Sequence, residues 1–376
     1  MKKGLILLVI AFIGISVPQA CKKPASNDTT PTETNGFDKK AMLTHYADDL
    51  IMPAYAAMQQ KIIDLQTASD AFIAAPSAAT QATVKTAFTA AYQQYQRVVA
   101  FQFGPAETAL LDVYVNYSGG LDYSFTTAGQ LTGFSVDTLA IENNISTGTY
   151  NLTTVNRSNL YAQGFPALGY LYFAPNATGK FATNGPARNQ YIKDVVARIK
   201  SLVDKVASDW TAYRTEFIAN TQTSNGSPIG NIVNQLAYQL DMLKGPRLGW
   251  PLGKQSNGVV FETKCEGYYA GNSIALATEN LKALKKLYTG ENSKNGIADY
   301  LIALKKGTLN DEVLAQFDIA LAKLVLIPDP LSASLVSQPA LADAAYKEVQ
   351  KLLTLLKTDV ASATAVQITF TDNDGD

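Results

Sequence analysis

The sequence predicts an all-α protein made of two helical bundles packed side by side. Apolar residues recur at spacings of three and four positions along most of the chain, which is the pattern of helices with one buried face. Serine or proline precedes several of these segments and glycine follows them, as is usual at helix ends. Only residues 367–371 alternate between apolar and polar side chains as a strand does. One short strand does not change the fold class.

Residues 41–180 are predicted to form the N-terminal bundle. Periodic apolar positions over residues 43–65 and 84–98 indicate two helices that pair antiparallel. Residues 104–158 lose this periodicity and are rich in Gly, Asn, Thr and Tyr, so we expect a long irregular insert there. Irregular segments of this length often carry function. A helix over residues 166–173 closes this half of the chain.

Residues 185–370 are predicted to form the C-terminal bundle, after a boundary within residues 176–185. Ser227 and Pro228 supply a capping hydroxyl and a first-turn proline for one helix, which ends before Gly245. The helices expected in this half cover residues 192–217, 229–243, 274–288, 313–325 and 345–356.

The first residues predict export. A pair of lysines precedes a mostly apolar stretch that is too short to cross a bilayer permanently, and Ala20 precedes Cys21. We therefore expect a signal peptide over residues 1–20. A cysteine directly after the cleavage point is the residue that lipoprotein processing acylates, so Cys21 is the expected lipid anchor to the membrane. Pro18 departs from the leucine that is usual at its position.

The segment after the anchor bears on the location of the protein. Residues 22–36 contain no large apolar side chain and cannot order themselves by burial, so residues 21–40 are expected to be a flexible tether. Lys22 stands where inner-membrane lipoproteins commonly have Asp, which favours the outer membrane of the cell envelope. The sequence leaves open whether the protein faces the periplasm or the cell surface. Residues 371–376 are expected to be an acidic tail.

The composition excludes several classes of function. The chain has 31 basic and 32 acidic residues and no long basic run, so nucleic acid is not an expected partner. His45 is the only histidine, which excludes zinc sites built from two or three imidazoles of one chain. We expect His45 to be a surface or helix-packing residue. Cys265 has no partner if Cys21 is acylated, and we expect it to be a small buried side chain.

Three stretches together carry a family resemblance. They are residues 92–105, which begin YQQYQR and end FGP, residues 164–173, GFPALGYLYF, and residues 265–273, CEGYYAGNS. In this order, and together with residues 48–55 and 248–254, they resemble imelysin-like proteins over nearly the whole mature chain. The resemblance implies an all-helical, two-bundle envelope protein linked to iron or haem uptake, with a peptidase label.

The family signature is Gly-x-His-x-x-Glu. Its imidazole and carboxylate share one helix face and can therefore meet one metal ion. The matching positions here are Gly164, Pro166 and Gly169. Neither Pro166 nor Gly169 has a side chain that binds metal, activates water or transfers a proton. We therefore expect no catalytic residue and no peptidase activity through this motif, while Pro166 is typical of a helix start.

Oxygen donors and cations remain as candidate ligand-binding groups. Carboxylate and phenolate oxygens suit hard ions such as ferric iron, while Arg and Lys suit an anionic ligand or cap carboxylates across the seam between the bundles. With 19 tyrosines in the chain, packing of aromatic rings is the commoner role of a tyrosine. The cofactor stays open between iron, haem and none. The candidates are Glu266, Tyr268, Asn272, Arg97, Glu107, Asp122, Tyr123, Arg247 and Lys254.

These observations favour a non-enzymatic, lipid-anchored protein that binds a ligand or a partner component in iron or haem acquisition, at the cleft between the bundles. The link to iron rests on the resemblance alone. A metallopeptidase is one alternative, and it would need ligands assembled from Glu266, Glu107, Asp112 and His45. A structural envelope protein is another, and it would show a filled seam without convergent polar groups.

Overall fold

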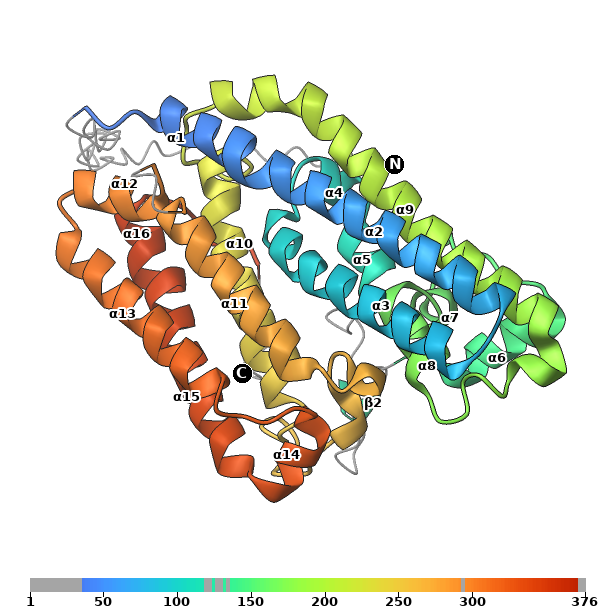
Figure 1. The fold of residues 1–376 in the computed structure, drawn as a ribbon. Coiled ribbons are helices and arrows are strands. Elements are labelled where there is room, and N and C mark those ends of the chain that lie inside the picture. Colours follow the sequence, from blue (N-terminus) through green and yellow to red (C-terminus); the bar gives the residue numbers. More distant parts are fainter. Residues whose placement is uncertain (1–35, 118–123, 126–130, 133–135, 292–294, 371–376) are drawn as a thin grey trace, which may run out of the picture. The chain divides into compact units, whose positions relative to one another are not determined.

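The computed structural model describes residues 36–117, 124–125, 131–132, 136–291 and 295–370 (Figure 1). None of the helices in these ranges is both long enough and apolar enough to span a bilayer. Several sequence predictions lie outside the described residues: the signal peptide, Cys21, most of the tether, Asp122, Tyr123 and the acidic tail.

The predicted all-α fold class is confirmed. Among the described residues the only strands are β1 (Ser124–Phe125) and β2 (Leu131–Thr132), which pair antiparallel. Short π- or 3₁₀-helical segments are labelled η. The helical elements up to the longest helix are α1 (Lys39–His45), η1 (Tyr46–Ile51), α2 (Met52–Ala74), α3 (Ala78–Val98), η2 (Val99–Phe101), α4 (Pro105–Thr108), α5 (Leu111–Val115), α6 (Thr138–Thr147), α7 (Arg157–Leu160), α8 (Gly164–Phe173) and α9 (Phe181–Ala219).

The second half of the chain begins with α10, which starts as the sequence predicts. Pro228 is its first residue, and the Ser227 hydroxyl accepts a hydrogen bond from the Gly230 N–H at 3.2 Å. The elements of this half are α10 (Pro228–Met242), η3 (Leu243–Gly249), η4 (Glu262–Lys264), η5 (Tyr268–Ala270), α11 (Ser273–Thr289), α12 (Ile297–Ala303), α13 (Gly307–Leu324), α14 (Leu331–Ser337), α15 (Pro339–Thr354), η6 (Leu355–Val360) and α16 (Ala361–Ala363).

Helices α2, α3, α8 and α9 pack into a first group (Figure 1). A reciprocal capping box between Ser77 and Thr80 starts α3 directly after the short turn from α2, so these two helices run antiparallel as expected. The long helix α9 lies along α2 and bends at Asn184, where the backbone leaves the helical conformation. Large aromatic side chains fill the interior of this group, among them Phe72, Phe88, Phe165, Tyr172 and Trp210.

Helices α10, α11, α13 and α15 form a second group, in which α13 packs against both α11 and α15 (Figure 1). The groups are joined, because α11 also contacts α3 and the described residues belong to one compact unit. The division of the chain between residues 180 and 185 stays a prediction. Helix α9 follows this boundary in the chain, yet it packs with the first group.

The end of the first helix is tied to the end of α11. Helix α1 begins at Lys39, inside the range expected to be tether. The Tyr46 hydroxyl donates to the Leu287 carbonyl at 2.7 Å and accepts from the Ile297 N–H at 2.9 Å. Beside it, the His45 ring contacts the Gly290 carbonyl through Nε2 at 2.8 Å. The lone histidine thus packs helices together, in line with its expected role.

Residues 104–158 are less irregular than the sequence suggests, because α4, α5 and α6 lie within them.

Helix α6 is anchored by Glu142. Burial by itself raises the pKa of Glu142, but hydrogen bonds to its carboxylate outweigh this effect and lower the pKa to about 2. The donors come from α8 and from the start of α9, and they are Tyr170, Lys180 and Arg188.

The strand predicted at residues 367–371 is wrong for its described part, residues 367–370, which form no strand. This stretch is held by one side chain instead of a neighbouring strand. The Asn234 amide donates to the Gln367 carbonyl at 2.9 Å and accepts from the Thr369 N–H at 2.8 Å. An asparagine side chain therefore supplies the donor and the acceptor that a partner strand would offer.

Candidate functional site

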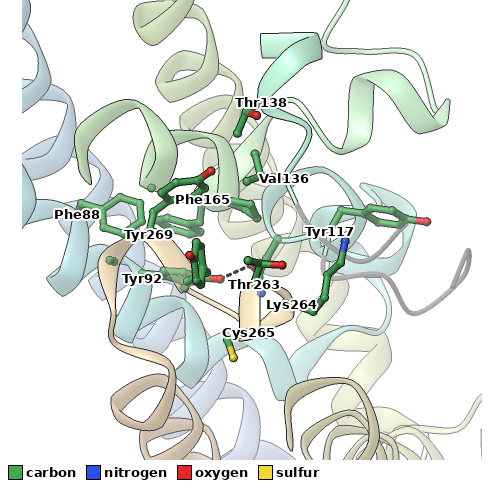
Figure 2. A pocket seen from close by; sticks show the side chains of 16 residues that line it. Phe88, Tyr92, Tyr117, Val136, Thr138, Phe165, Thr263, Lys264, Cys265 and Tyr269 are labelled. Atoms are coloured by element: carbon green, nitrogen blue, oxygen red, sulfur yellow. Dashed lines mark hydrogen bonds between the residues drawn. The ribbon is translucent and has the colours of Figure 1, made fainter. Parts of the chain in front are cut away.

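A cavity of about 270 Å³ lies where α3 and α8 face the chain segment around η4 and η5 (Figure 2). Its volume is close to the lower end of the range for small-molecule sites. The described residues that line it are Phe88, Tyr92, Asn116, Tyr117, Val136, Thr138, Phe165, Pro166, Gly169, Thr263, Lys264, Cys265, Gly267, Tyr268, Tyr269 and Ala270.

One wall of the cavity is aromatic and rigid. The rings of Tyr92 on α3 and Phe165 on α8 are stacked, with centroids 4.5 Å apart and planes 7° from parallel. Phe88 meets both rings edge to face, at 5.6 Å and 5.8 Å. Such mutually packed rings add specific attraction to their burial. This wall is therefore in place before any ligand enters.

The opposite rim is formed by η5. Gly267 and Gly271 flank it, and both have positive φ angles, 66° and 63°, which favour glycine. Between them, Tyr268 and Tyr269 lie edge to face with centroids 5.2 Å apart. Tyr269 also contacts the Tyr170 ring of α8 at 5.2 Å. The rim thus presents two aromatic side chains to the cavity from the second half of the chain.

A buried carboxylate lies behind the lining. Oε1 of Glu266 accepts hydrogen bonds from the side-chain amides of Asn116 at 2.8 Å and Gln96 at 3.0 Å. The Tyr92 hydroxyl lies 3.3 Å from the same oxygen and donates to Oδ1 of Asn116 at 2.6 Å. Because two lining residues contact it, Glu266 positions part of the cavity without lining it.

Arg247 balances the charge of Glu266. Its Nε lies 3.2 Å from Oε2 of Glu266, without the alignment of a hydrogen bond, and the two side chains are only 4% and 2% exposed. Asp112 belongs to the same interior. Burial raises the pKa of Asp112, although the hydrogen bond from the Tyr95 hydroxyl and the nearby Arg247 charge oppose this effect.

The signature segment begins α8, and its glycine has a backbone role. Gly164 has a φ of 71°, and a Cβ at this position would lie 2.3 Å from the Val115 carbonyl oxygen. The other two signature positions, Pro166 and Gly169, line the cavity. A Cβ on Gly169 would lie 3.6 Å from Cζ of Phe88, an ordinary contact. The signature glycine is thus present as Gly164, while the positions of the signature histidine and glutamate form part of the cavity wall.

The structure brings together some of the candidate residues. Glu266 and Arg247 form the buried ion pair, and Tyr268 lines the cavity. Asn272 is buried beside Gly267, where a Cβ would lie 2.4 Å from the Asn272 Oδ1. These residues come from two separate stretches of the sequence that fold against each other.

Three other candidates lie elsewhere. Arg97 pairs with Glu279 at 3.0 Å on α11, outside the cavity. Lys254 pairs with Asp343 and lies over the Tyr346 ring. The Glu107 side chain is exposed and contributes nothing to the cavity. Arg97 and Lys254 therefore join elements of the fold, which is the structural role that the sequence left open for them.

Most residues of the cavity wall were not among the candidates selected from the sequence. Tyr92 and Phe165 lie inside the segments that carry the resemblance, but the resemblance gave these two residues no role. Asn116, Tyr117 and Lys264 had no such signal. Asn116 lies in the insert, and only the fold brings it to Glu266.

The described residues around Glu266 do not fit a directly bound iron ion. In the described part of the chain, no three His, Cys, Asp or Glu side chains gather as metal ligands would. Both oxygens of Glu266 face protein donors or the Arg247 cation. A metal cation next to Arg247 would be repelled. We therefore derive no chemistry through a metal at this carboxylate.

Comparison with known proteins identifies the family of this chain. A sequence model of imelysin matches residues 51–360. The chain belongs to the imelysin family. It is also 22% identical over 315 residues to "Iron-regulated protein A" of Synechococcus elongatus, a match that covers 81% of this chain and 80% of that protein. The iron regulation in that name is a property of the relative.

Solved structures share the imelysin fold. An imelysin-like protein from Psychrobacter arcticum aligns with a TM-score of 0.68 at 17% identity, over 88% of this chain and 97% of its own. A protein from Parabacteroides distasonis, named there as a possible iron-regulated protein A precursor, aligns with a TM-score of 0.70 at 19% identity, over 87% and 94%. At these identities the two structures support the fold alone.

The framework role of Gly164 predicts a large loss of stability on substitution. We expect Gly164→Ala to lower the free energy of unfolding by about 2–4 kcal/mol, because the φ angle is unfavourable and the added Cβ meets the Val115 carbonyl. Chemical denaturation of the purified variant measures this change.

Gly185→Ala is the matched control. Gly185 lies in α9, and a Cβ there would meet no atom within 4 Å. Alanine favours a helix over glycine, so the control should change stability by less than about 1 kcal/mol. Equal effects of the two substitutions would show that Gly164 has no special backbone role.

Proposed function

We propose that this imelysin-family protein binds an organic ligand in the cavity as part of iron or haem acquisition, without hydrolysing peptide bonds. One observation carries the proposal. The positions at which the signature has its histidine and glutamate are Pro166 and Gly169, and both line the cavity. Both signature positions are thus part of the cavity wall. Neither Pro166 nor Gly169 has a side chain that acts as an acid, a base or a metal ligand.

The chemistry of the wall supports an organic ligand. Most lining side chains are aromatic, aliphatic or small, and Lys264 is the only charged one among the described residues, which is typical of sites for small molecules. The buried carboxylate of Glu266 is already engaged by Asn116, Gln96 and Arg247. Iron that enters the cavity would therefore be part of a larger molecule, such as a chelate or haem.

The connection to iron is supported by relatives. The Synechococcus elongatus protein that matches most of the chain carries the name "Iron-regulated protein A", and the resemblance noted from the sequence implies iron or haem uptake. We take regulation by iron and acquisition of iron as related roles, since a cell makes uptake proteins when iron is scarce. The function proposed here extends that link to this chain.

The metallopeptidase alternative has less support. It needs ligands from Glu266, Glu107, Asp112 and His45, but only Glu266 and Asp112 share an interior, the one around Arg247. Glu107 is exposed, and His45 contacts Asp49 and the Gly290 carbonyl. A purely structural protein would have a filled seam, whereas a cavity of about 270 Å³ lies between segments of the two halves.

We further propose that acylation of Cys21 holds the protein at the outer membrane. The support is the sequence alone: an export signal, the position of Cys21 and Lys22 after it. Cys21→Ala should move the protein from the membrane fraction to the soluble fraction of the envelope. Retention of the variant in the membrane fraction, at the wild-type level, would contradict a lipid anchor at this residue.

A filled cavity should abolish the proposed function. We expect a deletion strain to grow more slowly than its parent under iron limitation, and Gly169→Leu to fail in restoring growth, because the new side chain occupies the cavity while its Cβ fits beside Phe88. The purified wild-type protein should leave a protein substrate intact with iron or zinc present. Growth curves measure the complementation of the deletion strain. Gel electrophoresis shows whether the protein substrate stays intact.

Gly307→Leu is the control for this experiment. Gly307 begins α13, and a Cβ there meets no atom within 4 Å, so this variant should restore growth fully. Proteolysis by the pure protein that depends on metal, and that is lost on substitution around Pro166, would overturn the proposal. Full complementation by Gly169→Leu would show that the proposed function does not use the cavity.

A further inference from the structure

We infer that the cavity binds a planar aromatic carboxylate, with the ring against the aromatic wall and the carboxylate at Lys264. This inference rests on the proposed function, because it names the chemical class of the ligand for the same site. It follows from the shape of the lining, from the absence of carboxylates among the described lining residues, and from the position of one lysine.

The lining selects a flat ring. The stacked pair of Tyr92 and Phe165 presents a fixed aromatic surface, and Phe88 supports it from the side. Tyr268 and Tyr269 line the same cavity from η5, and Tyr269 is seen near Phe165 in Figure 2. A planar aromatic ligand gains contact with rings on both sides at little cost in conformational entropy, because the ring itself has no rotatable bonds.

Small residues leave the space for that ring. Gly169 on α8, together with Gly267 and Ala270 of the rim, carries little or no side chain into the cavity. Gly267 and Ala270 flank Tyr268 and Tyr269, and Gly169 lies four residues after Phe165. The imidazole and carboxylate of the family signature would occupy part of the volume that Pro166 and Gly169 leave open. The loss of these groups therefore enlarges a site for an apolar body.

No Asp or Glu is among the described residues that line the cavity. Burial raises the pKa of the Tyr92 hydroxyl well above its usual value and the pKa of the Cys265 thiol to about 12, so both stay protonated. The negative charge of Glu266 is covered by amide donors and balanced by Arg247. No lining group in the described residues would therefore repel an anion.

Lys264 gives the cavity its polarity. It is the only Lys, Arg, Asp or Glu among the described lining residues, and its side chain runs beside Tyr117 and Thr263 (Figure 2). Burial lowers the pKa of Lys264, since the ammonium has lost part of its water. A carboxylate placed beside it would add a charge-assisted contact in a partly dry site. Charge complementarity thus favours an acid over an amide or an amine.

This ligand class also fits the link to iron. Aromatic acids with adjacent hydroxyl groups hold ferric iron through hard oxygen donors. The ligand would then supply the metal-binding oxygens that Pro166 and Gly169 do not. The protein would contribute the aromatic wall and the ammonium, and the ligand would contribute the chelating groups.

Calorimetric titration of protein expressed from the full-length chain tests this inference. The probes are benzoate, 2,3-dihydroxybenzoate, benzamide and benzylammonium. We expect both acids to bind about tenfold more tightly than benzamide and benzylammonium to bind most weakly, as one charge-assisted hydrogen bond would give. Lys264→Met should remove the preference for acids and leave the benzamide affinity unchanged, and Gly169→Leu should abolish binding of all four.

Lys282→Met is the matched control, because Lys282 lies on α11, pairs with Glu279 and does not line the cavity. It should bind every probe as the wild type does, and thermal unfolding verifies that each variant is folded. Equal affinity for benzoate and benzamide, an acid preference that survives in Lys264→Met, or no binding of any probe would overturn the inference.

These outcomes are separable from failure of the proposed function. If aromatic acids bind through Lys264 but the deletion strain grows normally under iron limitation, the ligand class stands and the role in iron acquisition falls. If Gly169→Leu fails under iron limitation but no aromatic acid binds, the role in iron acquisition stands and the ligand class falls.

Discussion

The structure around the cavity depends on the buried pair of Glu266 and Arg247. Two charges removed from water carry a desolvation penalty of several kcal/mol each, which only close pairing and additional hydrogen bonds can offset. Glu266 meets that demand with groups from separate parts of the chain: amide donors of Gln96 on α3 and Asn116 after α5, and the cation of Arg247 on η3. A carboxylate in the second half is thereby neutralised jointly by the first and the second half.

This constraint positions the candidate site. Glu266 lies directly before Gly267 and the rim formed by η5, so fixing its carboxylate also fixes the rim relative to α3 and α8. Tyr92 connects the two layers, since its hydroxyl reaches Asn116 while its ring stacks on Phe165. The cavity is the space that remains between a rim held by charge and a wall held by aromatic packing. A carboxylate so occupied stabilises the fold and is not available as a metal ligand.

The sequence predicted the helical fold class and several helix starts, because a buried face repeats over many turns and a cap is a local signal. Ser227 with Pro228 is one such start. It also selected Glu266, which lies in a segment that carries the resemblance, and Arg247, as a cation that could bind an anion or cap carboxylates across the seam. It missed α4, α5 and α6, whose few turns give too little periodicity, and it overestimated the strand at the tail, where the partner is the distant Asn234 side chain. Glu107 was a candidate oxygen donor at the seam between the bundles, yet its side chain is exposed. Which carboxylates meet across the seam depends on tertiary packing, and no local pattern encodes that.

The central claim is that Glu266 is a structural carboxylate coupled to Arg247, and a double-mutant cycle tests it directly. Denaturant unfolding of Glu266→Ala, Arg247→Ala and the double variant gives the coupling free energy. Each single variant leaves an unpaired buried charge, so we expect each to lose about 3–5 kcal/mol and the double variant to lose clearly less than their sum. Strictly additive losses, or a Glu266→Ala variant as stable as the wild type, would contradict the account.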